Sequence, residues 1–174
     1  EQMMIANPGS SDTTRIVGVR PWGADEGGRY DITFTFGPIP AGSDCSNPIP
    51  ITSSGTITGT TVGFIDDYDL GSSNTCTGFR TGGPDVAYQV SLAAGQTLTA
   101  TLTPGGSWDA VLYVVSDCSA PVTTCLDGSD AGGIGVTEMV TYTATTAETV
   151  YLIVDGYLGS EAGSYTLDVM LSTP

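Results

Sequence analysis

Hydrophobic and polar residues alternate over several short stretches of the chain. In residues 86–92 the larger apolar side chains stand at every second position, and in residues 97–103 three apolar residues alternate with four threonines. A period of two is typical of a strand with one face on a core. Residues 109–115 are apolar on both faces, which predicts a central strand.

Further strands are expected from composition and pattern. Residues 56–62 are rich in threonine and residues 136–144 alternate again; β-branched side chains suit a pleated sheet. Residues 149–171 contain two apolar stretches around an acidic, Gly-rich turn, which predicts a closing β-hairpin. Residues 63–84 and 127–135 hold glycines and aspartates and predict loops. About eight short strands at this spacing predict an all-β fold, an antiparallel β-sandwich of jelly-roll or Greek-key type.

The hairpin pattern occurs twice. Residues 14–36 repeat the order found in residues 149–171: an apolar strand, an aromatic-Gly turn, an acidic-Gly loop, and Gly-x-Tyr leading into a second strand. The later copy follows a whole domain, whereas only thirteen residues precede the earlier one. Residues 37–43 are rich in proline and glycine and are typical of a linker. We therefore expect an N-terminal segment, residues 1–43, and a β-sandwich domain, residues 44–174.

The surplus N-terminal hairpin allows three interpretations. It is the last hairpin of an upstream repeat, or it folds back onto its own domain as extra strands, or it pairs with the sheet edge of another copy by strand addition. Two strands alone are marginal in water, and an isolated hairpin would expose its apolar face. A head-to-tail contact does not close, so its repetition gives a filament. The apolar residues available for such a contact are Ile16, Tyr30, Ile32, Phe34 and Phe36.

Charge narrows the range of functions. The chain has 19 acidic residues against 4 arginines, no lysine and no histidine, and a formal net charge of −15. Nucleic-acid binding is disfavoured, because it requires clustered Lys and Arg. An anionic membrane surface would repel a chain of this charge. No stretch approaches the roughly 18 apolar residues of a membrane span. The absence of histidine excludes a Ser-His-Asp triad and a Cys-His pair, and the absence of lysine excludes Schiff-base chemistry. Glycoside hydrolysis by paired carboxylates would need an aromatic-lined cleft that the pattern does not indicate. We expect a protein that is not an enzyme.

Four cysteines, Cys45, Cys76, Cys118 and Cys125, are widely spaced and even in number. Without histidine a zinc site is disfavoured, and disulfides in an oxidising, extracellular compartment fit better. Four cysteines allow three pairings. We expect Cys118–Cys125, closing a short loop, and Cys45–Cys76.

Aspartates form the only clusters of potential metal ligands in the sequence. Calcium binds six to eight oxygens, which acidic loops can supply. The loops do not match the spaced D-x-[DN]-x-[DN]-G pattern, and an aspartate in a Gly-rich loop is commonly a turn former. We expect no cofactor other than calcium. The candidate ligands are Asp66, Asp67, Asp69, Asp85, Asp109, Asp127 and Asp130.

Three motifs carry a resemblance to a known family. Residues 88–102 read YQVSLAAGQTLTATL, residues 108–114 read WDAVLYV, and residues 150–169 read VYLIVDGYLGSEAGSYTLDV. In this order they resemble the core of bacterial pre-peptidase C-terminal domains, over roughly residues 44 to 172. The resemblance implies a secreted, non-catalytic β-sandwich that is commonly attached to peptidases or repeated in large surface proteins, and some relatives bind calcium or a fibrous substrate. The cysteines and the N-terminal hairpin depart from that pattern.

Together these observations predict a structural subunit of a secreted or cell-surface filament. The N-terminal segment would act as the donor strand, with residues 29–36 pairing with the next copy as a homopolymer forms. The alternative is an accessory module, binding calcium or substrate, from a larger secreted peptidase or surface protein.

Overall fold

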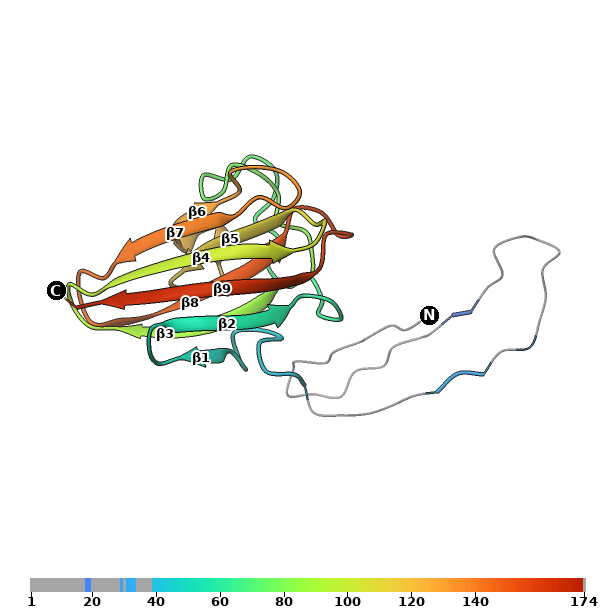
Figure 1. The fold of residues 1–174 in the computed structure, drawn as a ribbon, viewed down its shortest axis with the longest axis horizontal. Helices are drawn as coiled ribbons and strands as arrows, with labels where there is room; N and C mark the ends of the chain where they lie inside the picture. The colour runs from blue at the N-terminus through green and yellow to red at the C-terminus, as the bar shows by residue number, and fades with distance from the viewer. Residues whose placement is uncertain (1–17, 20–28, 30, 34–38, 174) are drawn as a thin grey trace.

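A computed structural model describes residues 18–19, 29, 31–33 and 39–173. Within these residues nine strands form two sheets that face each other as a β-sandwich (Figure 1). Sheet A has the strand order β1-β3-β8-β5-β6, and sheet B has the order β2-β9-β4-β7. The elements are β1 Ile49–Ile51, β2 Gly55–Thr60, β3 Val86–Leu92, β4 Thr97–Gly105, β5 Ala110–Val115, α1 Pro121–Thr124, β6 Cys125–Ser129, β7 Glu138–Thr143, β8 Glu148–Gly156 and β9 Ser164–Ser172. In this part of the chain no helix has the length and apolar character that a membrane span requires.

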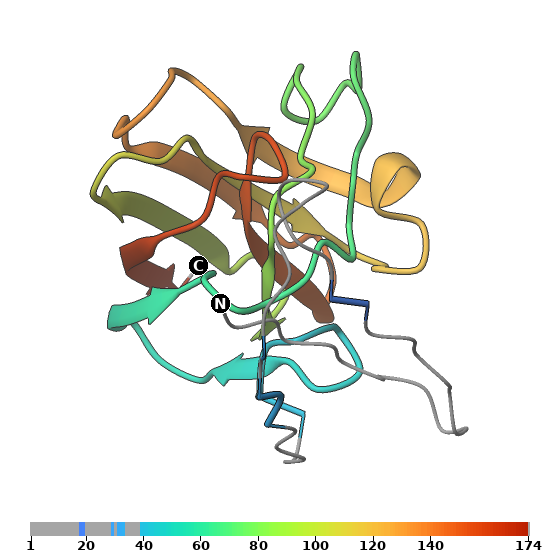
Figure 2. The ribbon, with the colours of Figure 1, turned by 90° about the vertical axis from the view of Figure 1, so that its right-hand side faces the viewer.

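The predicted all-β sandwich is confirmed, and the alternating stretches explain its core. In β4 the apolar residues Leu98, Ala100 and Leu102 are fully buried, while the threonines between them lie on the outer face of sheet B. Every strand pair is antiparallel except β1 with β3. The inward side chains of both sheets make one continuous core. It lies between the two layers of strands that Figure 2 shows end-on. Period-two burial therefore determines which face of each strand meets the other sheet.

The centre of sheet A is buried on both faces. Residues 61–84, which we call the covering loop, lie over its outer face. Tyr68 and Leu70 of this loop pack on Val111, Tyr113 and neighbouring residues of sheet A in a second apolar cluster. All six residues of β5 are buried, and β5 lies between β8 and β6. The prediction of a central strand from its uninterrupted apolar sequence is confirmed.

The predicted closing hairpin, residues 149–171, is wrong. Its two strands do not pair: β8 lies between β3 and β5 in sheet A, whereas β9 lies between β2 and β4 in sheet B. Residues 157–163 cross from one sheet to the other, and a connection of that length does not impose a tight hairpin turn. The crossing needs a glycine at its start, because a Cβ on Gly156 would clash with the Glu161 carbonyl oxygen.

Two strands of the structure were not predicted from the sequence. β1 has three residues with Pro50 at its centre, and β6 contains Asp127 and Gly128 within the predicted acidic loop. Proline, aspartate and glycine are depleted in strands, so propensity predicts loops at both places. Both strands lie at sheet edges, where such residues are tolerated.

The expected disulfide pairing is also wrong. Cys45 is bonded to Cys118 with a Cα–Cα distance of 6.3 Å, and Cys76 to Cys125 with a Cα–Cα distance of 5.8 Å. Between Cys118 and Cys125 the chain forms α1 and then enters β6, and all four cysteines pack against the cluster on the outer face of sheet A. The bonds therefore hold the covering loop and the start of the domain onto sheet A.

Candidate functional site

Within the part of the chain that the structure describes, one strand edge of the sandwich is open. Among the described residues β2 has a single neighbouring strand, β9. In an antiparallel ladder alternate residues direct their N–H and C=O groups away from the partner, so the outer side of β2 presents unpaired backbone groups. The strand reads GTITGT and contains neither proline nor a charged residue. It carries none of the sequence devices by which proteins protect an edge.

The other three edges are protected. β1 is short and contains Pro50, and β6 is short with a register irregularity in its partner at Val114 and Val115. In β7 the Thr141 N–H donates to Asp127 Oδ2 at 2.6 Å. Here β6 and β7 pack against each other, which closes that side of the sandwich. The opposite side, bounded by β1 and β2, is the open one (Figure 2).

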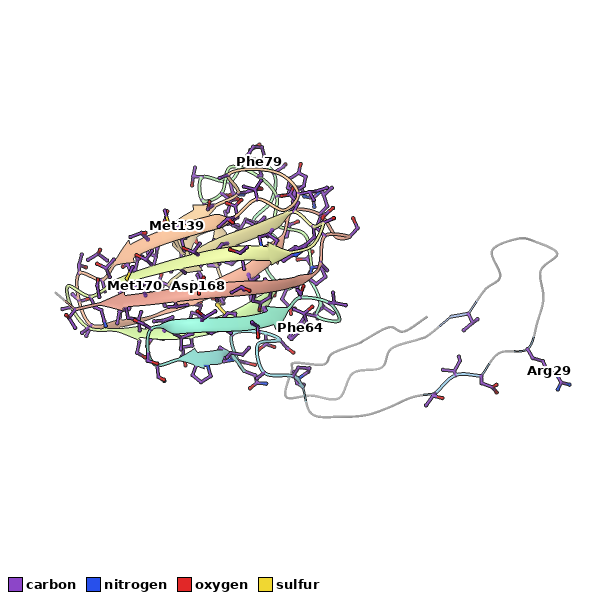
Figure 3. All side chains as sticks on the ribbon, in the orientation of Figure 1. Arg29, Phe64, Phe79, Met139, Asp168 and Met170 are labelled. Carbon is purple, nitrogen blue, oxygen red and sulfur yellow. A yellow bond between two sulfur atoms is a disulfide. The ribbon has the colours of Figure 1, made fainter. Side chains whose placement is uncertain are left out.

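An apolar rim borders the open edge. Ile49 of β1, Ile57 of β2 and Phe64 of the covering loop pack against the main core but are only partly buried. Phe64 lies beside β2 in Figure 3. A strand added next to β2 with an apolar inward face would extend the core at this rim.

Two carboxyl groups are buried beneath the covering loop. Asp85 and Asp155 both have 0% of their surface exposed. Asp85 Oδ2 accepts the N–H groups of Asp67 at 2.7 Å and Tyr68 at 3.1 Å. Asp155 Oδ2 lies 2.9 Å from the Tyr113 hydroxyl, and its Oδ1 accepts the Gly156 N–H at 2.6 Å.

Burial decides the ionisation of this pair. It raises the pKa of Asp85 to about 9, with the negative charge of Asp155 as the next cause. It also raises the pKa of Asp155 well above its ordinary value, although the bonds from Tyr113 and Gly156 act in the other direction. Burial therefore favours the protonated form of both carboxyl groups. Asp85 holds the backbone of the covering loop, Asp155 binds Tyr113 of β5, and Asp85 Oδ1 has no partner among the described residues.

A surface pocket of about 210 Å³ lies at the end of the sandwich where β5 begins and β8 ends. Its lining residues are Phe79, Asp109, Asp130, Ala131, Gly132 and Tyr157. Phe79 and Tyr157 meet edge to face, with ring centroids 6.4 Å apart. Phe79 is 54% exposed, at the tip of the loop labelled in Figure 3.

Three acidic side chains in or near the pocket each have one oxygen without a hydrogen-bond donor in the described part of the chain. Asp109 Oδ1, Asp130 Oδ2 and Glu138 Oε1 are buried oxygens without a partner among the described residues. Glu138 is 0% exposed, and its other oxygen accepts the Ala131 N–H at 2.8 Å. Burial, followed by the charges of Asp109 and Glu138, raises the pKa of Asp130 to about 6. Of the three, Asp109 and Asp130 line the pocket, and two neighbouring carboxyl groups disfavour each other's ionised form unless a cation is supplied.

The seven predicted calcium ligands do not form one site. Asp66, Asp67 and Asp69 stay in the covering loop, where Asp69 forms an ion pair with Arg80 at 2.9 Å. Asp85 is buried beneath that loop, and Asp127 holds the edge of β7. Asp109 and Asp130 share the pocket. Within the described ranges no group of three or more His, Cys, Asp or Glu residues is arranged to hold a metal ion. Calcium binding stays a prediction.

The predicted interface residues fall mostly outside the described residues. Ile16, Tyr30, Phe34 and Phe36 lie there, and Ile32, which the structure describes, is 43% exposed.

Sequence reasoning missed Asp155, Glu138 and Phe79. Asp155 follows an unbroken apolar stretch, which is a usable signal for a buried carboxyl group. Glu138 begins a strand and Phe79 lies in a Gly-rich loop, and neither position carries a signal of its own.

No known protein family and no curated protein matches the sequence. Solved structures do. The chain is similar to a pre-peptidase C-terminal domain. That domain, from the collagenase of Bacillus anthracis, shares 15% identity over 70% of this chain and 93% of its own, with a TM-score of 0.47.

Two further solved structures are similar to the chain. PliG of Aeromonas hydrophila, a periplasmic inhibitor of g-type lysozyme, shares 18% identity over 72% of this chain and 96% of its own, with a TM-score of 0.48. CorA, a surface-associated copper-binding protein of Methylomicrobium album BG8, shares 13% identity over 74% of this chain and 96% of its own, with a TM-score of 0.40.

Proposed function

We propose that this chain is a non-catalytic structural subunit of a secreted or cell-surface filament, assembled by β-strand addition. Residues 29–36 of one copy pair with β2 of the next. The observation that supports the proposal is the open edge of β2 beside a partly buried apolar rim. The other strand edges are short, or capped by a side chain.

The donor sequence fits this edge. Tyr30, Ile32, Phe34 and Phe36 share one face of residues 29–36, and arginine, aspartate and threonines share the other. Placed beside β2, the apolar face would cover the rim formed by Ile49, Ile57 and Phe64. The unpaired backbone groups of β2 would gain hydrogen bonds along the whole strand.

Head-to-tail addition explains why the result is a filament. The donor and the acceptor are different surfaces of the same chain, so each added copy presents a new free edge and a new free donor. Two disulfides on the outer face of sheet A suit an oxidising compartment, where an extracellular filament is built.

The experiment compares two charge insertions on opposite faces of the donor. Phe34→Asp places a carboxylate on the apolar face, and Thr33→Asp places one on the polar face of the same segment. We expect sedimentation to show large species for the unaltered chain and for Thr33→Asp, and monomer for Phe34→Asp. Monomeric unaltered chain at high concentration would contradict the proposal.

A second candidate is an accessory module that binds calcium. It is favoured by the three partnerless oxygens of Asp109, Asp130 and Glu138 among the described residues. Bound calcium stabilises the folded state by mass action, so EDTA should lower the melting temperature of a calcium-loaded chain. A melting temperature unaffected by either calcium or EDTA would exclude this candidate.

A further inference from the structure

The arginines of this chain are unevenly distributed. Arg15, Arg20 and Arg29 precede residue 44, and Arg80 is the only cationic side chain after it. Fourteen of the 19 acidic residues follow residue 43. The sandwich is therefore strongly negative, while the donor segment carries most of the positive charge.

The one arginine after residue 43 forms an ion pair with a residue outside the pocket lining. The Arg80 guanidinium donates to Asp69 Oδ2 at 2.9 Å, within the covering loop. Burial raises the pKa of Asp109 and of Asp130, and the charges that raise it further come from other acidic groups, Glu138 among them. Like charges gathered in a partly buried place disfavour their ionised forms unless a cation is supplied.

The shape of the pocket favours an organic cation. A pocket of about 210 Å³ is smaller than the cavities of drug-sized ligands and suits a single side chain. Phe79 and Tyr157 provide aromatic faces for cation–π contact, and Asp109 and Asp130 provide carboxylate oxygens. A guanidinium group uses both, because it stacks on rings and forms paired hydrogen bonds with carboxylates.

We propose that this pocket binds the guanidinium group of Arg20 from the N-terminal segment of a second copy. The inference rests on the proposed strand addition and assigns to it a second contact. It gives the acidic end of the sandwich a role in holding the neighbouring subunit.

Reach excludes Arg29 and allows Arg20. The pocket lies at the end of the sandwich where Thr60 of β2 pairs with Ser164, because residues 157–163 connect Tyr157 to that same end. A donor antiparallel to β2 would place Arg29 at this end. Crossing the sheet from its edge to the pocket takes roughly 15–20 Å at the usual strand spacing, which exceeds one side chain. Arg20 precedes Arg29 by nine residues, and an extended segment of that length spans about 30 Å.

The test uses the full chain with Phe34→Asp, which keeps the acceptor edge and loses its own donor. Synthetic peptides of residues 14–36 are titrated into it, either unaltered or with Arg20→Gln, and the Kd is measured by calorimetry. We expect Arg20→Gln to weaken binding about tenfold. A peptide with Arg29→Gln is the matched control and should bind within about twofold of the unaltered peptide.

Variants of the pocket complete a double-mutant cycle with the peptide variants. Asp109→Asn with Asp130→Asn should cause the same tenfold loss, and should remove the difference between the unaltered peptide and the Arg20→Gln peptide. Asp117→Asn, at an exposed residue outside the pocket, should leave Kd unchanged. Equal binding of the two peptides to the unaltered pocket would overturn the Arg20 assignment and leave strand addition intact. Absence of binding by every peptide would overturn strand addition itself.

Discussion

Asp85 and Asp155 show how burial sets the chemistry of single residues in this chain. A carboxyl group inside an apolar layer keeps its proton because the charged form has lost its water. Asp85 directly precedes β3 and Asp155 lies near the end of β8. Their positions are local in the sequence, but their burial depends on the packing of the covering loop on sheet A. The sequence identified Asp85 as acidic and conspicuous but assigned it to calcium.

The raised pKa of Asp85 predicts an unusual pH dependence of stability. The folded pKa, about 9, exceeds the unfolded value, about 4. The contribution of protonated Asp85 to the free energy of unfolding is therefore fully present below pH 4 and is lost as the pH rises toward 9. Asp85→Asn removes this ionisation, so its free energy of unfolding should exceed that of the unaltered chain by more than about 1 kcal/mol at pH 8.

Denaturant titrations between pH 4 and pH 9 measure this difference. The matched control is Asp117→Asn, because Asp117 is exposed and its pKa is lowered by hydrogen bonds from Ser119. It should keep the pH slope of the unaltered chain. Identical slopes for Asp85→Asn and the unaltered chain would show that Asp85 is ionised in the folded state.

At the scale of elements, the disulfides determine how the covering loop lies on sheet A. Cys76 joins this loop to Cys125 at the first residue of β6, across a sequence separation of 49 residues. Closing a loop of that length restricts the unfolded chain by about 4 kcal/mol in the entropy model. We expect Cys76→Ser with Cys125→Ser to lower the free energy of unfolding by a comparable or smaller amount.

Peptide mapping tests the pairing directly. Digestion without reduction should release one peptide pair containing Cys45 and Cys118, and another containing Cys76 and Cys125. A fragment with Cys118 bonded to Cys125 would contradict the arrangement of the covering loop.

The strands show which parts of the fold could be predicted from the sequence. β3, β4 and β5 were predictable, because period-two patterns and uninterrupted apolar runs report burial on one or both faces. The sheet assignment of β8 and β9 was not, because a hairpin and a crossing between sheets have the same local pattern. The pocket combines Phe79, Asp109 and Asp130 from three separate loops, and no local pattern encodes that meeting. The open edge of β2 likewise depends on which strands pair beside it.

At the scale of the whole molecule, the two sides of the sandwich differ. One side is closed by β6 against β7, and the other side leaves β2 with an unpaired outer edge among the described residues. The body is acidic and the N-terminal segment holds three of the four arginines. Both asymmetries favour the approach of the N-terminal segment of another copy over contact between two sandwiches.

Amide hydrogen exchange of β2 tests the central claim most directly. The assembled chain is compared with monomeric Phe34→Asp, residue by residue over Gly55–Thr60. Strand addition predicts that alternate amides of β2 become protected on assembly, while the protected edge at Thr141 of β7 stays unchanged. Assembled protein in which the β2 amides exchange as fast as in the monomer would contradict it.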